Sequence, residues 1–254
     1  MTSSSKEAML AESTINIVRH QDDVHTRLAA VIEAIFPLPE EDYLAMGLED
    51  YRTLMLKAQS KLIEGNFVSR VIISIKADLE SYLATDRFLV QSNLYLRAAR
   101  PGMPRHYENI DWHRESFYGP NVEKSVNIWT PIRGVTLKNS LRYIPNSHTI
   151  PDEQIITYNE GSTVTPKYSA GHQLGFNYDP KVIRSGVDLS QAATMVVPEK
   201  SIAIFSGNLI HGAAINLDTK IRFSIDFQVI RKSDYSSSNK NFHFSSGKPY
   251  FIDL

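Results

Sequence analysis

The sequence contains no cysteine among its 254 residues. This absence excludes disulfides, thiolate zinc sites, iron–sulfur clusters and a cysteine nucleophile, so His, Asp or Glu must hold any bound metal. Long apolar runs are also lacking: no stretch approaches the roughly 18 residues that read as a membrane span, and the polar start has no run of signal-peptide length. We therefore expect a cytoplasmic protein without a membrane partner.

Neither sign of charge is in excess, because 27 Lys and Arg stand against 28 Asp and Glu and the formal net charge is −1. The sequence therefore lacks the basic surplus typical of a nucleic-acid groove, and we expect no nucleic-acid partner. Apolar residues make up 42% of the chain and aromatic residues 10%, which is enough to bury a core. No internal repeat divides the chain, so we interpret residues 1–254 as a single domain.

The first third of the chain carries helical periodicity. Apolar residues recur at helical spacing in three segments, which predict helices over 21–36, 48–63 and 68–83. Pro37 and Pro39 end the first segment, and Gly65 caps the second. We expect residues 1–85 to form a mainly helical layer that packs against the rest of the molecule.

After Asp86 the pattern changes to short runs of β-forming residues separated by Pro, Gly and Asn. The predicted strands are residues 88–97, 125–131, 141–144, 194–197, 201–205 and 221–230. Several short strands with turns between them are typical of a sandwich or barrel. We predict an α+β protein with a jelly roll (a double-stranded β-helix, or cupin-like barrel) over residues 86–235. The polar, aperiodic segment 151–191 is interpreted as a lid insertion.

Two short segments suggest a metal site. Residues 110–119 read IDWHRESFYG, with His113 two residues before Glu115, and residues 207–216 read GNLIHGAAIN around His211. If the first segment is a strand, His113 and Glu115 point to the same face. With His211 they offer two nitrogens and one oxygen, the ligand set of non-haem Fe(II) oxygenases. The alternative is a surface His and Glu on an exposed strand.

Eleven residues after His211 comes Arg222, within the alternating run IRFSIDF. Ser224 shares its strand face, and a guanidinium fork beside a hydroxyl is suited to bidentate binding of a carboxylate. The alternative is an internal salt bridge from Arg222 to Asp226 or another acid.

Two further strand positions are candidates for cosubstrate binding, namely Gln91 and Asn127. Gln91 and Asn93 share a polar strand face. If that face is the barrel interior, either side chain reaches the cosubstrate or the substrate. The alternative is that the face is exposed to solvent. Asn127 is expected to line the cavity, and Trp129 either closes it or belongs to the core. His148, in a Pro-Asn-Ser-His turn, is expected to form local hydrogen bonds rather than to bind a metal.

The order of the segments WHRE, SVNIWTPI, NSLRYIPNSH, FSGNLIHGAAIN and IRFSIDF resembles the phytanoyl-CoA dioxygenase-like branch of the Fe(II)/2-oxoglutarate dioxygenases. The resemblance covers about residues 91–230. This chain has Glu115 where that family usually has Asp, and Asn139-Ser140 where Asn-Gly is usual. The resemblance implies the double-stranded β-helix fold with a helical packing layer.

The resemblance also implies roles for individual residues. His113, Glu115 and His211 would bind Fe(II), and Arg222 with Ser224 would hold the distal carboxylate of 2-oxoglutarate. Halogenases of the superfamily lack the carboxylate ligand. The presence of Glu115 therefore favours hydroxylation or a related oxidation.

The implied function is a dioxygenase that uses Fe(II), 2-oxoglutarate and O2 and releases succinate and CO2. The polar composition of residues 151–191 favours a small polar metabolite of a biosynthetic pathway as substrate, and no apolar run suggests an acyl chain. The alternatives are a non-catalytic cupin-type metal- or sugar-binding protein and a metalloenzyme, such as an isomerase, that does not use 2-oxoglutarate.

Overall fold

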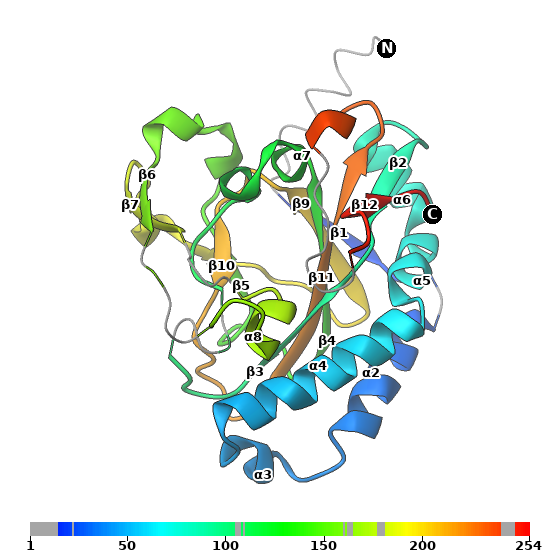
Figure 1. Ribbon diagram of the computed structural model, residues 1–254, viewed down its shortest axis with the longest axis vertical. Coiled ribbons are helices and arrows are strands. Elements are labelled where there is room, and N and C mark those ends of the chain that lie inside the picture. The colour runs from blue at the N-terminus through cyan, green and yellow to red at the C-terminus, as the bar shows by residue number, and fades with distance from the viewer. Residues whose placement is uncertain are drawn as a thin grey trace.

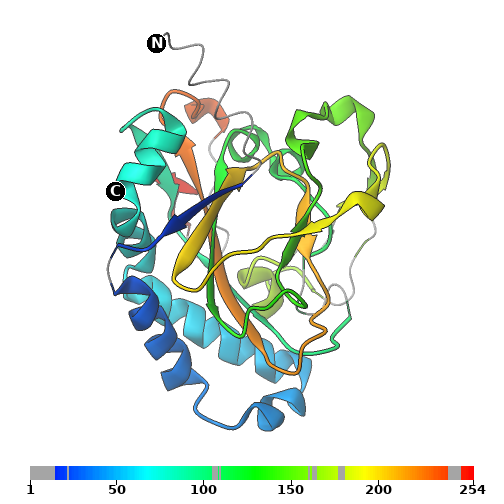
Figure 2. The same ribbon diagram turned by 180° about the vertical axis from the view of Figure 1, so that it is seen from behind.

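The computed structural model describes residues 15–239 and 247–254, apart from residues 22, 105–107, 109, 160, 162–164 and 177–180. Helices from the first third of the chain cover one side of a large antiparallel sheet (Figure 1). The view from behind shows a smaller sheet beside the large one (Figure 2). Among the described residues, no helix is both long enough and apolar enough to cross a membrane.

The helical layer agrees with the expected segments except in two places: a short helix over residues 40–44 was not predicted, and the last expected helix is divided. Its members are α2 (Val24–Ile35), α3 (Glu40–Leu44), α4 (Leu48–Glu64), α5 (Phe67–Ser74) and α6 (Lys76–Leu83). The single helix expected over residues 68–83 is in fact two, because Ile75 leaves the helical region with a φ of −126°. At that point the Ser74 hydroxyl donates to the backbone carbonyl of Val71 over 2.8 Å, a local bond that competes with the helix ladder.

The larger sheet contains seven antiparallel strands, in the order β1-β9-β4-β11-β2-β12 with β3 also paired to β11. These strands are β1 (Asn16–Arg19), β2 (Phe88–Gln91), β3 (Tyr95–Ala99), β4 (Val126–Arg133), β9 (Ser201–Ser206), β11 (Arg222–Arg231) and β12 (Phe251–Ile252). Three details correct the expectations. The region expected to be helical begins with an edge strand, the strand expected over 88–97 is two strands, and the sheet continues beyond residue 235 with β12.

The smaller sheet consists of β10 (His211–Ala213), β5 (Leu141–Tyr143) and β8 (Ala193–Thr194), in the order β10-β5-β8. Strands from both sheets line one cavity, whose walls include Trp129 on β4 and Leu141 on β5. The arrangement is the predicted double-stranded β-helix with a helical layer on its outer face.

Strand β11 shows how one sequence pattern builds both sides of the larger sheet. Its apolar residues, Phe223, Ile225, Phe227 and Val229, are buried in the cluster that joins the sheet to the helices. The residues between them, Arg222, Ser224, Asp226 and Gln228, lie on the opposite face, because successive strand side chains alternate in direction. Three of these four line the cavity.

The segment 151–191 is not structureless where it is described. It contains the hairpin β6 (Ile156–Asn159) and β7 (Lys181–Ser185) and the short helix α8 (Ala170–Gln173). The α8 region is fixed to α4, because Arg52 donates to Thr165 over 3.1 Å and Gln59 donates to the carbonyl of Gln173 over 3.1 Å. Among its described residues only Gly175 lines the cavity, so its role as a lid stays a prediction.

The helical layer is attached to the sheet through an aromatic contact. Phe36, just after α2, packs edge-on against Phe223 of β11 with ring centroids 4.9 Å apart. We expect Phe36→Ala to lower the free energy of unfolding by about 3–5 kcal/mol, because it removes buried apolar surface and leaves a cavity. Ile73→Ala is the control: Ile73 is 66% exposed, so its change should stay within about 0.5 kcal/mol. Urea denaturation measures both, and equal losses would contradict the assignment.

Candidate active site

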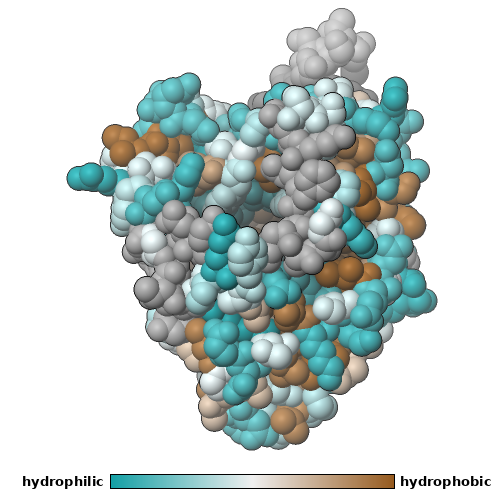
Figure 3. Space-filling view, in the orientation of Figure 1, coloured by the Kyte–Doolittle hydropathy of each residue, from teal (hydrophilic) through white to brown (hydrophobic). Residues whose placement is uncertain are grey.

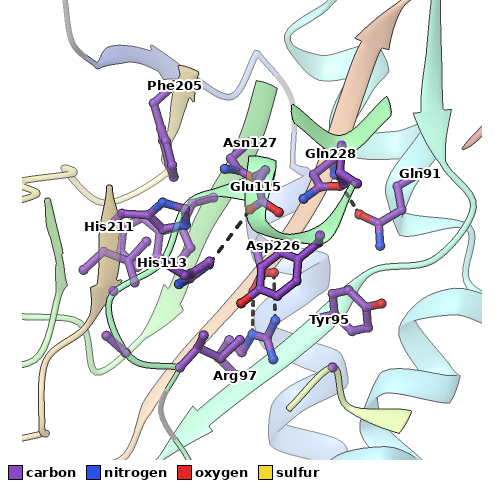
Figure 4. A pocket seen from close by; sticks show the side chains of 18 of the residues that line it. Gln91, Tyr95, Arg97, His113, Glu115, Asn127, Phe205, His211, Asp226 and Gln228 are labelled. Atoms are coloured by element: carbon purple, nitrogen blue, oxygen red, sulfur yellow. Dashed lines mark hydrogen bonds and ion pairs between the residues drawn. The ribbon is translucent and has the colours of Figure 1, made fainter. Parts of the chain in front are cut away.

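The residues predicted to bind a metal come together. One ligand atom each from His113, Glu115 and His211 can be chosen so that all three lie within 4.8 Å of one another, and all three residues are buried. The His113 Nε2 and Glu115 Oε1 atoms are 4.0 Å apart, and the two imidazole centroids are 4.3 Å apart. Figure 4 shows the three side chains converging at one wall of the cavity.

The local structure behind this convergence differs from the expectation. Residues 110–119 do not form a strand; His113 makes an isolated bridge to His211 with two reciprocal backbone hydrogen bonds of 2.9 and 3.0 Å. Glu115 then begins a short 3-10 helix, η1 (Glu115–Tyr118). The shared direction of His113 and Glu115 therefore comes from a bridge followed by a tight turn and not from strand alternation.

The backbone of Glu115 is held by a close approach of chain segments. Its N–H donates to the carbonyl of Gly207 over 2.8 Å. A Cβ at position 207 would lie 2.8 Å from the carbonyl oxygen of Ser125 and 3.1 Å from the Glu115 Cγ. A glycine is required here because any side chain would clash with the Ser125 carbonyl and crowd the Glu115 side chain.

Both histidines are prepared to bind a cation. The Nδ1–H of His113 donates to the carbonyl of Asp111 over 2.7 Å, and that of His211 donates to the carbonyl of Leu209 over 2.8 Å. Burial lowers the pKa of His113 to about 4 and that of His211 to about 3, so both rings are neutral near pH 7. With Nδ1 protonated, the Nε2 lone pairs face each other and Glu115, as a metal site requires.

The protein itself stabilises the negative charge of the buried Glu115 carboxylate only weakly. Burial raises its pKa to about 7, and the side chains of Asn127 and Gln228 oppose the rise. A bound divalent cation would reverse this shift, because it would be the largest local charge. The two imidazoles and one carboxylate fit a six-coordinate ion that keeps three positions open.

A buried arginine, Arg222, lies in the same cavity. Arg222 lines it and is 1% exposed, and its Nη1 donates to the carbonyl of Asn139 over 2.8 Å. Within the described part of the chain, the buried Arg222 Nε and Ser224 Oγ atoms have no hydrogen-bond partner. Burial lowers the pKa of Arg222 to about 10, so the group stays cationic at neutral pH.

The internal salt bridge considered for Arg222 does not form, because Asp226 has another partner. Arg97 on β3 binds it in a bidentate pair, with Nε–Oδ1 at 2.7 Å and Nη2–Oδ2 at 3.0 Å (Figure 4). No acid among the described residues pairs with Arg222. The cavity thus contains one guanidinium already paired and one available to an anion.

Of the other residues considered from the sequence, three line the cavity and His148 does not. Gln91 is 1% exposed and lines the cavity, so its strand face points to the interior at this residue and not to solvent. Asn127 faces Glu115, and Trp129 is both buried in the core and part of the cavity wall. His148 lies in η2 (Ser147–Thr149) outside the ligand cluster, as expected.

The cavity encloses about 320 Å³, within the size range of small-molecule sites. Several of its residues were not predicted from the sequence to line a site: Tyr95, Arg97, Tyr118, Phe205, Asp226, Gln228 and Tyr250. Tyr250 directly precedes β12 and lines the cavity from the C-terminal end of the chain. Strand β12 has only two residues, so no periodic pattern in the sequence could predict it. Figure 3 shows a hollow in the molecular surface beside the β6–β7 hairpin.

Comparisons with known proteins agree with this geometry. A family model described as Phytanoyl-CoA dioxygenase (PhyH) matches residues 6–224. A search of curated proteins found none that matches this chain.

Among solved structures, the chain resembles the non-heme monooxygenase ThoJ in its apo form, with a TM-score of 0.53 and 17% identity over 87% of this chain and 77% of that chain. It also resembles EvdO2 from Micromonospora carbonacea var. aurantiaca, with a TM-score of 0.52 and 13% identity over 93% of this chain and 95% of that one. EvdO2 complexed with 2-oxoglutarate gives a TM-score of 0.51 at 13% identity over the same shares. At such low identities these likenesses show a shared fold.

We expect His113→Ala and His211→Ala each to weaken binding of Co(II) or Fe(II) by at least about 100-fold. Loss of a residue that only hydrogen-bonds to a metal ligand already lowers metal affinity by about 10–100-fold, and loss of the ligand itself should cost at least as much. Anaerobic titration followed by the visible absorption of Co(II) measures the affinity. His148→Ala is the control and should bind the metal as the unchanged protein does. Equal affinities in all of these proteins would show that the triad is not the metal site.

Proposed function

We propose that this chain, which belongs to the phytanoyl-CoA dioxygenase (PhyH) family, is an Fe(II)- and 2-oxoglutarate-dependent dioxygenase that oxidises an unactivated C–H bond of a small polar metabolite of a biosynthetic pathway. One observation carries the proposal. A buried two-His-one-carboxylate cluster and a buried arginine without an acidic partner among the described residues share one cavity.

In this proposal His113, Glu115 and His211 hold the iron. When bound, Fe(II) and 2-oxoglutarate supply the O2-dependent oxidation of the C–H bond, with release of succinate and CO2. The protein contributes the neutral, correctly protonated imidazoles and the fixed carboxylate. The presence of Glu115 as the third ligand favours oxygenation over halogenation.

Arg222 and Ser224 bind the distal carboxylate of 2-oxoglutarate. The carbonyl of Asn139 holds one arm of the guanidinium, while Nε and the serine hydroxyl remain available on the cavity face. A carboxylate here would satisfy both buried groups and neutralise a cation that would otherwise lie uncompensated at low dielectric. This pair favours a 2-oxoglutarate enzyme over a cupin-type binding protein or an isomerase, neither of which needs it.

Asn127 acts on the metal ligand. Its side chain, with that of Gln228, faces the Glu115 carboxylate and lowers the pKa of that group against the effect of burial. The two amides thereby favour the charged form of the carboxylate, which is the form that binds a metal. We therefore assign Asn127 as a positioning residue for Glu115.

The test is an anaerobic titration with Fe(II) and 2-oxoglutarate, followed through the visible charge-transfer band of the chelate. We expect the band in the unchanged protein and an affinity for 2-oxoglutarate at least about 10-fold lower in Arg222→Ala, because charge-assisted hydrogen bonds contribute about 1.5–3 kcal/mol. Arg184→Ala, at an exposed position of β7, is the matched control and should keep the affinity.

Two outcomes would contradict the proposal. Iron binding without the band would show that the cavity does not accept 2-oxoglutarate and would favour another metalloenzyme. Full activity of Arg222→Ala without a requirement for 2-oxoglutarate would remove the carboxylate-binding role of this arginine.

A further inference from the structure

Polar side chains gather in the part of the cavity that lies along β11 from Arg222. Figure 4 shows Gln91 on β2, Tyr95 and Arg97 on β3, and Asp226 and Gln228 on β11. Tyr250, near the C-terminus, also lines the cavity. Gln228 is six residues beyond Arg222, which is about 20 Å along an antiparallel strand. The far end of this group, at Gln228, is therefore distant from the arginine that holds the distal carboxylate of 2-oxoglutarate in the proposed function.

The ion pair in this group is internally complete. Two nitrogens of Arg97 bind the two oxygens of Asp226, and the third, Nη1, donates to the carbonyl of Leu174 over 2.7 Å. The Asp226 side chain is nevertheless 29% exposed, so its carboxylate keeps lone pairs open to the cavity. The pair thus offers hydrogen-bond acceptors but no net charge.

Gln91 supplies a buried donor beside them. Its Oε1 accepts from the backbone N–H of Gln228 over 2.9 Å, which fixes the amide so that Nε2 is the free end. Among the described residues this Nε2 has no hydrogen-bond partner, although the side chain is 1% exposed and lines the cavity. A buried donor of this kind calls for an acceptor on a ligand.

The other fixed charges of the cavity wall are already assigned. Glu115 belongs to the metal cluster and Arg222 to the carboxylate site, while Glu108 is paired with Arg100 at 2.6 Å. A charged group on the substrate would therefore meet no free counter-charge among the described lining residues, and burying it would be unfavourable. Aromatic rings of Tyr95, Tyr118 and Tyr250 complete the wall with apolar faces.

We propose that Gln91 and the Arg97–Asp226 pair form a substrate subsite for an uncharged ring compound that carries neighbouring hydroxyl groups, as a glycoside does. A hydroxyl both donates and accepts, so one donates to Asp226 while another accepts from Gln91, and the C–H face of the ring lies against the tyrosines. This inference rests on the proposed function and reassigns Gln91 from the cosubstrate to the substrate.

The test measures binding without turnover. The protein, loaded anaerobically with Fe(II) and 2-oxoglutarate, is titrated by calorimetry with phenyl β-glucopyranoside, phenyl β-glucuronide and the phenyl glycoside of glucosamine. These probes have nearly the same size and differ in charge. We expect the neutral glycoside to bind at least about 10-fold more tightly than either charged one, because only the charged probes leave a buried charge unpaired.

Two variants separate the parts of the subsite. Asp226→Asn leaves Arg97 uncompensated and should shift the preference by about 10-fold or more toward the glucuronide. Gln91→Glu keeps an oxygen that accepts from the N–H of Gln228 but removes the Nε2 donor, and should lower the affinity for the neutral probe by about 10-fold. Asp50→Asn, at an exposed position of α4, is the control and should bind all three probes unchanged. Thermal unfolding shows that each variant is folded.

The inference is overturned if a charged probe binds the unchanged protein as well as the neutral one, or if none of the three binds at millimolar concentration. It is also overturned if neither variant alters the order of preference. Failure of the proposed function is distinguishable, because it appears before any glycoside is added, as the absence of the charge-transfer band in the unchanged protein.

Discussion

The two backbone hydrogen bonds exchanged by His113 and His211 are the constraint on which the site depends. They join residues almost a hundred positions apart and place both imidazoles on one side of the bridge. A single turn supports both partners: the Ser147 hydroxyl accepts from the N–H of Ile210, and its carbonyl accepts from Arg114. Because Arg114 lies between His113 and Glu115, this turn holds the segments that carry all three ligands. The ligand atoms are thus preorganised by neutral backbone contacts, which lets the cluster lie close together before any cation compensates Glu115.

Strand β11 connects this site to the stability of the fold. Its apolar face is part of the core shared with the helices, and its polar face provides Arg222, Asp226 and Gln228 to the cavity. The cavity therefore has one wall whose position is set by close packing and not by a loop. Close-packed interiors deform little, so Arg222, Asp226 and Gln228 keep fixed positions on this wall. Buried Arg52 and Gln59 also hold the α8 region to α4, which fixes the segment that brings Gly175 to the cavity.

The sequence was sufficient for features that depend on local periodicity or motif order. Alternation on residues 221–230 placed Arg222 and Ser224 on one face of β11. Motif order grouped His113, Glu115 and His211, although the strand expected around His113 does not form. The sequence was not sufficient for features that depend on register. Arg97 lies opposite Ser224 and Asp226 opposite Tyr95, so the ion pair runs diagonally between β3 and β11. Alternation assigns Arg97 and Asp226 to a face but does not say which residues become neighbours.

The same register explains why two buried arginines facing one cavity differ in what they can bind. Arg222 lies opposite Ala99, which offers no charge, and its described neighbours supply only the carbonyl of Asn139. Arg97 lies one diagonal step from an acid and is fully paired. The residue between these two environments is Ser224, on the same face as both Arg222 and Asp226. An acid at position 224 would stand directly opposite Arg97 and beside Arg222, and would compete for the guanidinium that the ligand carboxylate needs. A small hydroxyl at that position leaves the guanidinium of Arg222 without an acidic partner on its own strand, and this is the condition that the proposed carboxylate site and the proposed uncharged subsite share.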